Sequence, residues 1–168
     1  MEINELLQNI GSAFQDVPRA STSLRQFWLT DEKGLSGTLT PDEWRLASVT
    51  RTDANWTDIA AIEIETYGCQ LAHMPGDAFS YYLPAYMSYA AAKVGEPAPG
   101  DAILSFTIYG LVPSAQHPPY SEQQYSLLTS RQRESVASFL TFVSEHSDEY
   151  VCHEAQQALR HWAPRGLA

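Results

Sequence analysis

Hydrophobic residues recur every three to four positions in the first fifteen residues of the chain. One stripe at 100° per residue contains Ile3, Leu6, Leu7, Ile10 and Phe14, which is the pattern of an amphipathic helix. The next stretch, residues 17–37, lacks such a stripe and is rich in Pro, Ser, Thr and Gly. We therefore expect a helix over residues 1–15 and an ordered loop after it.

Two later segments carry explicit helix starts. Thr40 is an N-cap residue followed by Pro41 and two carboxylates, an arrangement that favours the first turn of a helix and predicts one to about Ser48. Thr129 and Gln132 fit a capping box, and the stripe after them contains Val136, Phe139, Leu140 and Val143.

A second stripe follows the opening at Ser147-Asp148-Glu149, and it contains Val151, Ala155, Ala158, Leu159 and Trp162. Pro164 and Gly166 end it. The two stripes predict a C-terminal helical hairpin with a tight connection near residues 146–147.

Three segments are harder to assign. Residues 57–67 fit a helix but also alternate with period two, so a strand stays the alternative. Residues 101–112 are apolar nearly throughout, which indicates burial without deciding between helix and strand. Residues 113–125 are polar and contain prolines, so we expect a loop with a short exposed polyproline stretch at residues 118–120.

The segment SYYLPAYMSYAAA, residues 80–92, concentrates four tyrosines around Pro84. On a continuous helix from Gly76 to Ala92, an arc of Phe79, Leu83, Met87 and Ala90 would face the core, with Tyr82, Tyr86 and Tyr89 beside it. Tyr81 would lie nearly opposite, toward the surface. Because proline removes a donor and disfavours helix at the preceding residue, we expect a kink or two abutting helices.

These elements predict a mainly α protein: a single-domain helical bundle over residues 1–168 with a proline-kinked central helix and a C-terminal helical hairpin. The chain of 168 residues is long enough to bury a core without disulfide or metal support.

The net charge of the chain disfavours some classes of binding partner. The formal net charge is -10 and the isoelectric point about 4.8, which disfavours nucleic acid and anionic membrane surfaces as partners. From residue 53 to residue 101, Lys93 is the single basic residue among seven carboxylates: Asp53, Asp58, Glu63, Glu65, Asp77, Glu96 and Asp101. A basic protein surface would complement this part of the chain.

The N-terminus lacks the pattern of a signal peptide, and no run of 18 apolar residues occurs. We therefore expect a cytoplasmic protein that does not enter a membrane. Its two cysteines, Cys69 and Cys152, are expected to be free thiols in that compartment.

The sequence offers few candidates for chemistry. No glycine-rich phosphate loop is present. The group of Cys152, His153, Glu154 and His161, with His146 nearby, lacks zinc-ligand spacing. Cys69 and His73 are four residues apart but lack an oxyanion-hole loop. We expect no cofactor and no metal.

The pairing of SYYLPAYM with the later LLTSRQRESVASFLTFV resembles an uncharacterised bacterial family of small acidic proteins, a domain of unknown function. The resemblance covers roughly residues 55–145. Its most specific positions are Tyr82-Leu83-Pro84-Ala85 and Leu128-Thr129 with Gln132 and Phe139-Leu140. It implies a shared fold in a bacterial cytosolic protein, and it supplies no catalytic residue.

Small size, acidity and the Tyr and Trp content favour a protein-binding domain over an enzyme. Its most concrete form is an immunity or antitoxin protein that occupies the basic cleft of a bacterial toxin. The predicted contact residues are Tyr81, Tyr82, Tyr86, Asp77, Glu63, Glu65 and Asp58. The alternatives are a small hydrolase-like enzyme with a site near His73, Asp77 and Tyr82, and a non-catalytic adaptor subunit.

Overall fold

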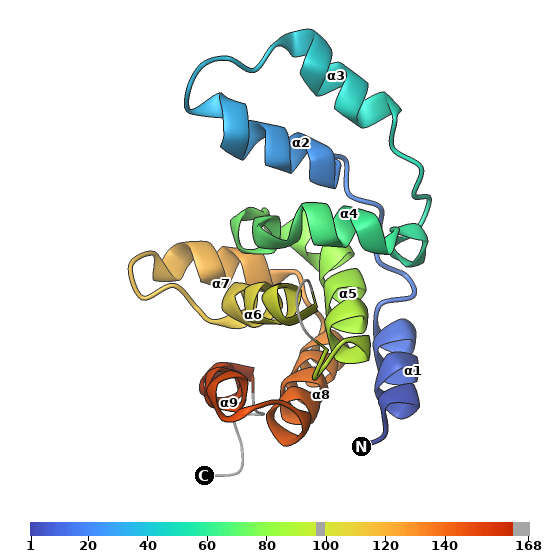
Figure 1. The fold of residues 1–168 in the computed structure, drawn as a ribbon, viewed down its shortest axis with the longest axis vertical. Coiled ribbons are helices and arrows are strands. Elements are labelled where there is room, and N and C mark those ends of the chain that lie inside the picture. Colours follow the sequence, from blue (N-terminus) through green and yellow to red (C-terminus); the bar gives the residue numbers. More distant parts are fainter. Residues whose placement is uncertain (97–99, 163–168) are drawn as a thin grey trace.

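The computed structural model describes residues 1–96 and 100–162, and within these ranges every regular element is helical (Figure 1). The prediction of a mainly α bundle is confirmed. Three short elements are π- or 3₁₀-helical and are labelled η. In chain order the elements are α1 (Ile3–Ala13), α2 (Leu24–Leu29), η1 (Thr30–Gly34), α3 (Pro41–Val49), η2 (Trp56–Asp58), α4 (Ala61–Thr66), η3 (Gly68–His73), α5 (Gly76–Ala92), α6 (Gly100–Leu111), α7 (Pro118–Ser126), α8 (Ser130–His146) and α9 (Glu149–Trp162).

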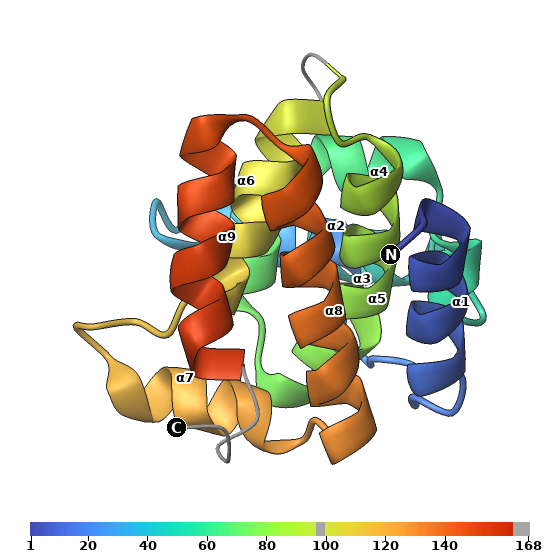
Figure 2. The same ribbon diagram turned by 90° about the horizontal axis from the view of Figure 1, so that it is seen from below.

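Helix α5 is the centre of the fold and packs against α1, α6, α7 and α8 (Figure 2). It is apolar on nearly all sides, which is the signature of a helix enclosed by others. Pro84 lies within one continuous helix, so the alternative of two abutting helices is wrong. Neighbouring helices bury Pro84 and the residues around it.

The C-terminal hairpin of α8 and α9 has the predicted form. The Thr129 hydroxyl accepts a hydrogen bond from the backbone N–H of Gln132. The side-chain oxygen of Gln132 accepts one from the backbone N–H of Thr129, which completes the capping box. The predicted stripe on α8 is buried throughout. At the end of α9, the Trp162 indole donates to the Leu111 carbonyl at 2.8 Å and ties the hairpin to α6.

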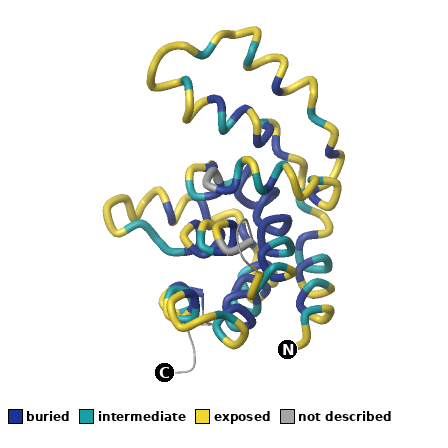
Figure 3. Tube along the Cα trace, in the orientation of Figure 1, coloured by how far each residue is buried: buried dark blue, intermediate teal, exposed yellow. Residues whose placement is uncertain are grey.

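Helices α2 and α3, joined by η1, project from one end of the bundle (Figure 1). We call residues 23–49 the arm. Helix α3 packs chiefly against α2. Two hydrogen bonds join them: Ser23 Oγ donates to the Ala47 carbonyl at 3.1 Å, and Gln26 Nε2 donates to the Trp44 carbonyl at 3.3 Å. Most of η1 and α3 is exposed (Figure 3).

Two segments expected to be loops contain helices. Within residues 17–37, Ser23 and Gln26 form a capping box that starts α2. Within residues 113–125, Pro118 and Pro119 occupy the first two positions of α7, where proline needs no amide partner. The expected loop over residues 17–37 and the expected polyproline stretch at residues 118–120 are therefore wrong.

The two undecided segments are helical. Residues 57–58 belong to η2, residues 61–66 to α4 and residues 101–111 to α6, so the strand alternative is excluded. The predicted end of the last helix at Pro164 and Gly166 lies outside the described residues. Within the described ranges, no helix combines the length and the apolar character needed to cross a membrane.

Candidate functional site

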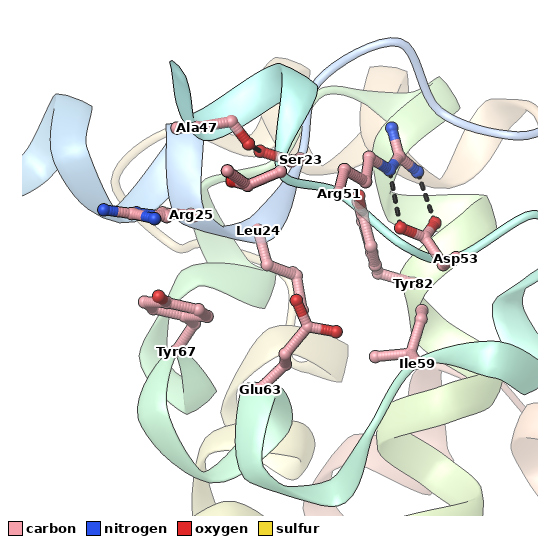
Figure 4. A pocket seen from close by; sticks show the side chains of 11 residues that line it. Ser23, Leu24, Arg25, Ala47, Arg51, Asp53, Ile59, Glu63, Tyr67 and Tyr82 are labelled. Atoms are coloured by element: carbon pink, nitrogen blue, oxygen red, sulfur yellow. Dashed lines mark hydrogen bonds and ion pairs between the residues drawn. The ribbon is translucent and has the colours of Figure 1, made fainter. Parts of the chain in front are cut away.

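A buried ion pair lies where the chain leaves the arm and returns to the bundle. Arg51 Nε donates to Asp53 Oδ1 at 2.7 Å, and Arg51 Nη2 donates to Asp53 Oδ2 at 2.6 Å (Figure 4). The two side chains are only 5% and 6% exposed. Arg51 Nη1 also donates to the Ala20 carbonyl, so the guanidinium joins two segments of the chain. This bidentate geometry is the strongest form of arginine–carboxylate contact.

Two tyrosines of α5 complete this cluster. The Tyr81 hydroxyl donates to Asp53 Oδ2 at 2.6 Å, and the Tyr82 hydroxyl donates to the Thr22 carbonyl at 2.9 Å. The Arg51 guanidinium lies 5.5 Å from the Tyr81 ring centroid and 5.9 Å from that of Tyr82. The cluster therefore fastens the base of the arm to the central helix.

The expectation that Tyr81 reaches the surface is wrong, because Tyr81 is 1% exposed. A helical projection places Tyr81 opposite the core arc, and that side of α5 is covered by the segment that carries Arg51 and Asp53. The sequence periodicity of α5 contains no information on this covering segment.

The ionisation states of Asp53 and Tyr81 suit a fixed structural contact between the base of the arm and α5. Burial alone would raise the pKa of Asp53, but the hydrogen bonds from Arg51 and Tyr81 hold that pKa below its usual range. Burial raises the pKa of Tyr81, and the hydrogen bond to Asp53 raises it further. Asp53 is therefore ionised and Tyr81 protonated near neutral pH, and each has a hydrogen-bond partner within the cluster.

A small pocket of about 180 Å³ lies beside the ion pair, between the arm and the bundle (Figure 4). Leu24 and Ala47 approach it from the arm, and Glu63 reaches toward it from α4. This volume is below that of a typical small-molecule site. The pocket lies between the arm and α4 and is too small to be an ordinary ligand-binding cavity.

The alternative catalytic residues do not come together. Tyr82 lines the 180 Å³ pocket, His73 a separate hollow of about 900 Å³, and Asp77 a third of about 600 Å³. Three side chains that line three different hollows do not form a shared site for one substrate.

The predicted contact residues are largely occupied within the fold. Tyr82 and Tyr86 are buried like Tyr81, and the Tyr86 hydroxyl donates to the Tyr67 carbonyl at 2.7 Å. Glu65 accepts a hydrogen bond from Tyr89 at 2.6 Å.

The remaining predicted acidic residues differ in their exposure and in their hydrogen bonds. Asp58 is exposed but accepts hydrogen bonds from the Ala54 and Asn55 amides at 3.0 Å and 2.8 Å. Glu63 is half-buried and Asp77 is exposed. Because Tyr81, Tyr82 and Tyr86 are buried, the predicted residues do not form one exposed acidic and aromatic face.

The sequence-based prediction missed the exposed apolar residues of the arm. There are four, with exposed fractions of 98% for Leu35, 36% for Trp44, 49% for Leu46 and 65% for Val49. On α3 only Ala47 is buried. A signal was available, because Trp44 lies 140–200° around the helix from Leu46 and Val49, and a single neighbouring helix cannot cover both sides.

Thiol and metal candidates gain no support from the geometry. Among the residues that the structure describes, no group of three or more His, Cys, Asp or Glu side chains is placed to hold a metal ion. Cys152 is a free thiol that accepts a hydrogen bond from Gln156 Nε2 at 3.3 Å. The side chain of Cys69, the cysteine considered together with His73 as a nucleophile, lies outside the described residues.

Comparison with known proteins identifies a family. A model of a family of unknown function (DUF6714) matches residues 2–165, so the chain belongs to this family. No curated protein and no solved structure matches the chain.

Proposed function

We propose that this member of a family of unknown function is a non-catalytic protein-binding domain that contacts its partner through the arm. The observation that carries the proposal is the exposure of four apolar residues of the arm, Leu35, Trp44, Leu46 and Val49. Leu46 and Val49 are three residues apart and share one side of α3. The arm projects from the bundle, where a partner can approach this exposed apolar pair (Figure 1).

The exposed apolar residues of the arm suit a partner with an apolar centre, and the charge of the whole chain favours a basic partner. Tryptophan, the residue type of Trp44, is enriched among the residues that dominate the binding energy of interfaces. The arm also exposes the carboxylates of Asp31, Glu32 and Asp42, of which Asp42 lies 3.7 Å from the guanidinium of Arg45. With a net charge of -10 for the chain, long-range attraction favours a basic partner and speeds the encounter.

The most concrete form of the proposal is an immunity or antitoxin protein whose partner is a bacterial toxin with a basic cleft. The acidity of the chain and the exposed apolar residues of the arm support this form. A non-catalytic adaptor subunit would use the same surface. The two forms differ in the partner, because a toxin stops growth when expressed alone and is harmless when coexpressed with its immunity protein.

The experiment compares three tagged proteins as bait in lysate from the native host. They are the wild type, the arm variant Leu46→Ser/Val49→Ser, and a control variant, Leu127→Ser/Tyr150→Ser, that removes apolar groups of similar exposure from outside the arm. We expect a stoichiometric partner on the wild type and control, and its loss from the arm variant. Binding should weaken from 50 to 500 mM salt, because screening reduces the attraction.

Capture that is equal for the arm variant and the control would contradict the proposal. A complex indifferent to salt would contradict the basic-partner component. The immunity form fails if the captured protein does not impair growth when expressed alone.

A further inference from the structure

The largest hollow described above, about 900 Å³, lies away from the arm and is not part of the proposed partner surface. It is bounded by η3, the end of α6, the connection after it, and α7. Its volume is within the range of small-molecule sites. We call it the α6–α7 pocket.

The lining of the α6–α7 pocket is unusual for this chain. The protein has 20 Asp and Glu residues and 10 Lys and Arg residues, yet none of these four residue types is among the described residues that line the pocket. Its polar groups are instead histidine, serine, glutamine and tyrosine side chains. A ligand with a formal charge would find no fixed opposite charge there to offset its lost hydration.

One wall of the pocket is held by buried hydrogen bonds. Gln124 is 3% exposed, and its Nε2 donates to the carbonyls of Leu71 at 3.3 Å and Met74 at 2.8 Å. These bonds fix the amide plane and leave Oε1 as the acceptor that Gln124 contributes to the lining. The Tyr125 hydroxyl donates to the Gly110 carbonyl at 2.9 Å and joins α7 to α6.

Aromatic surface is available at the opening. The Tyr109 side chain is 68% exposed and that of Tyr120 is 40% exposed. The Tyr120 hydroxyl donates to the Met74 carbonyl at 3.1 Å, which restrains its ring. Both rings can pack against a flat apolar group.

We propose that the α6–α7 pocket binds an uncharged small molecule that combines a planar ring with an amide-type hydrogen-bonding group. The ring packs against Tyr109 and Tyr120, and an N–H of the ligand donates to Gln124 Oε1. His73 and His117 supply further hydrogen-bonding groups on the lining. This site is independent of the arm and of its protein partner.

Three probes of nearly equal shape test this assignment: benzamide, which is neutral, benzoate, an anion, and benzamidinium, a cation. Each is titrated to 20 mM into the ¹⁵N-labelled full chain at pH 7.5, and amide shifts are followed by NMR. We expect benzamide to shift the amides of residues 109–125 in a saturable manner, and the two charged probes to bind at least tenfold more weakly.

Two variants supply the matched control. Tyr109→Ala should weaken benzamide binding by roughly two- to tenfold, the contribution of one aromatic contact. Tyr150→Ala removes a tyrosine of equal exposure, 70%, from the start of α9 and should leave binding unchanged. The proposal is overturned if no probe shifts residues 109–125, if a charged probe binds as well as benzamide, or if Tyr109→Ala has no effect.

Discussion

Helices α5 and α3 both contain aromatic residues and a proline, but their surroundings differ. Twelve of the 17 residues of α5 are buried, whereas on α3 only Ala47 is. Helices α1, α4, α6, α7 and α8 pack around α5, whereas α3 rests chiefly on α2. The aromatic side chains of α5 are therefore committed to the fold, while Trp44 on α3 keeps surface free for a partner.

Aromatic residues on a helix can fill the core or remain on the surface, and the two helices differ in this respect. Tyr81, Tyr82 and Tyr86 place their rings in the core and their hydroxyls on acceptors within the fold, as with Tyr82 on the Thr22 carbonyl. The arm carries fewer aromatic residues: Phe27 and Trp28 are half-buried and Trp44 is exposed. Because elements with few buried contacts open at low free energy, we expect the arm to be the less stable region.

The largest expected difference comes from removing one aromatic ring from each helix. Phe79→Ala on α5 should reduce the free energy of unfolding by about 3–5 kcal/mol, because Phe79 is fully buried and its loss leaves a cavity. Trp44→Ala on α3 should cost less than about 1 kcal/mol. Urea denaturation followed by circular dichroism measures both, and equal losses would remove the distinction between the two helices.

The second prediction concerns the contact between the arm's base and α5. Asp53→Asn should cost about 3 kcal/mol, because it leaves the buried Arg51 guanidinium without its opposite charge. Asp58→Asn is the matched control: it changes an exposed aspartate that caps a short turn, and it should cost less than about 1 kcal/mol. A similar cost for both variants would show that the buried pair does not stabilise the fold.

The same pair predicts a dependence on pH. In the folded chain the pKa of Asp53 is below that of an unfolded aspartate, about 3.9. Its contribution is therefore present above about pH 4 and is lost as the pH falls through the folded-state pKa. The stability difference between wild type and Asp53→Asn should shrink between pH 6 and pH 3.

Denaturation midpoints over this range give the measurement. Glu43, whose pKa the hydrogen bond from Lys33 lowers to about 2, titrates in both proteins and cancels from the difference. A difference that stays constant from pH 6 to pH 3 would contradict the assignment to Asp53.

The smallest expected effect on stability is on the exposed face of the arm. Leu46→Ser and Val49→Ser should each change the free energy of unfolding by no more than about 0.5 kcal/mol, because both side chains are about half exposed or more. The same denaturation assay checks this. A loss of several kcal/mol would mean that the arm's apolar residues support the fold, and the partner surface would lose its basis.

Local signals in the sequence predicted much of the fold. The N-cap at Thr40, the capping box at Thr129 and the stripe ending at Val143 are all present in the structure. Helix α2 was missed although its own capping box, Ser23 with Gln26, is visible in the sequence, because the surrounding Ser, Thr, Pro and Gly residues indicated a loop. Helix α7 was missed because Pro118 and Pro119 were assigned to an extended segment instead of the first turn of a helix.

The candidate site was less predictable because it depends on contacts between distant segments. Asp53 and Tyr81 are 28 positions apart in the sequence, and no pattern between them indicates their hydrogen bond. The exposure of Trp44, Leu46 and Val49 depends on how few helices pack against α3, which tertiary structure decides. Net charge indicated a basic partner but could not show that Asp58 and Glu65 serve contacts within the fold.

The most direct test of the arm as a partner surface is hydrogen–deuterium exchange on the free chain and on the complex captured with the wild type. In the free chain, α3 amides should exchange faster than those of α5 and α8. In the complex, protection should rise over residues 35–49 and stay unchanged at the α8–α9 connection. Protection confined to the bundle, with the arm exchanging as fast as in the free chain, would contradict the account.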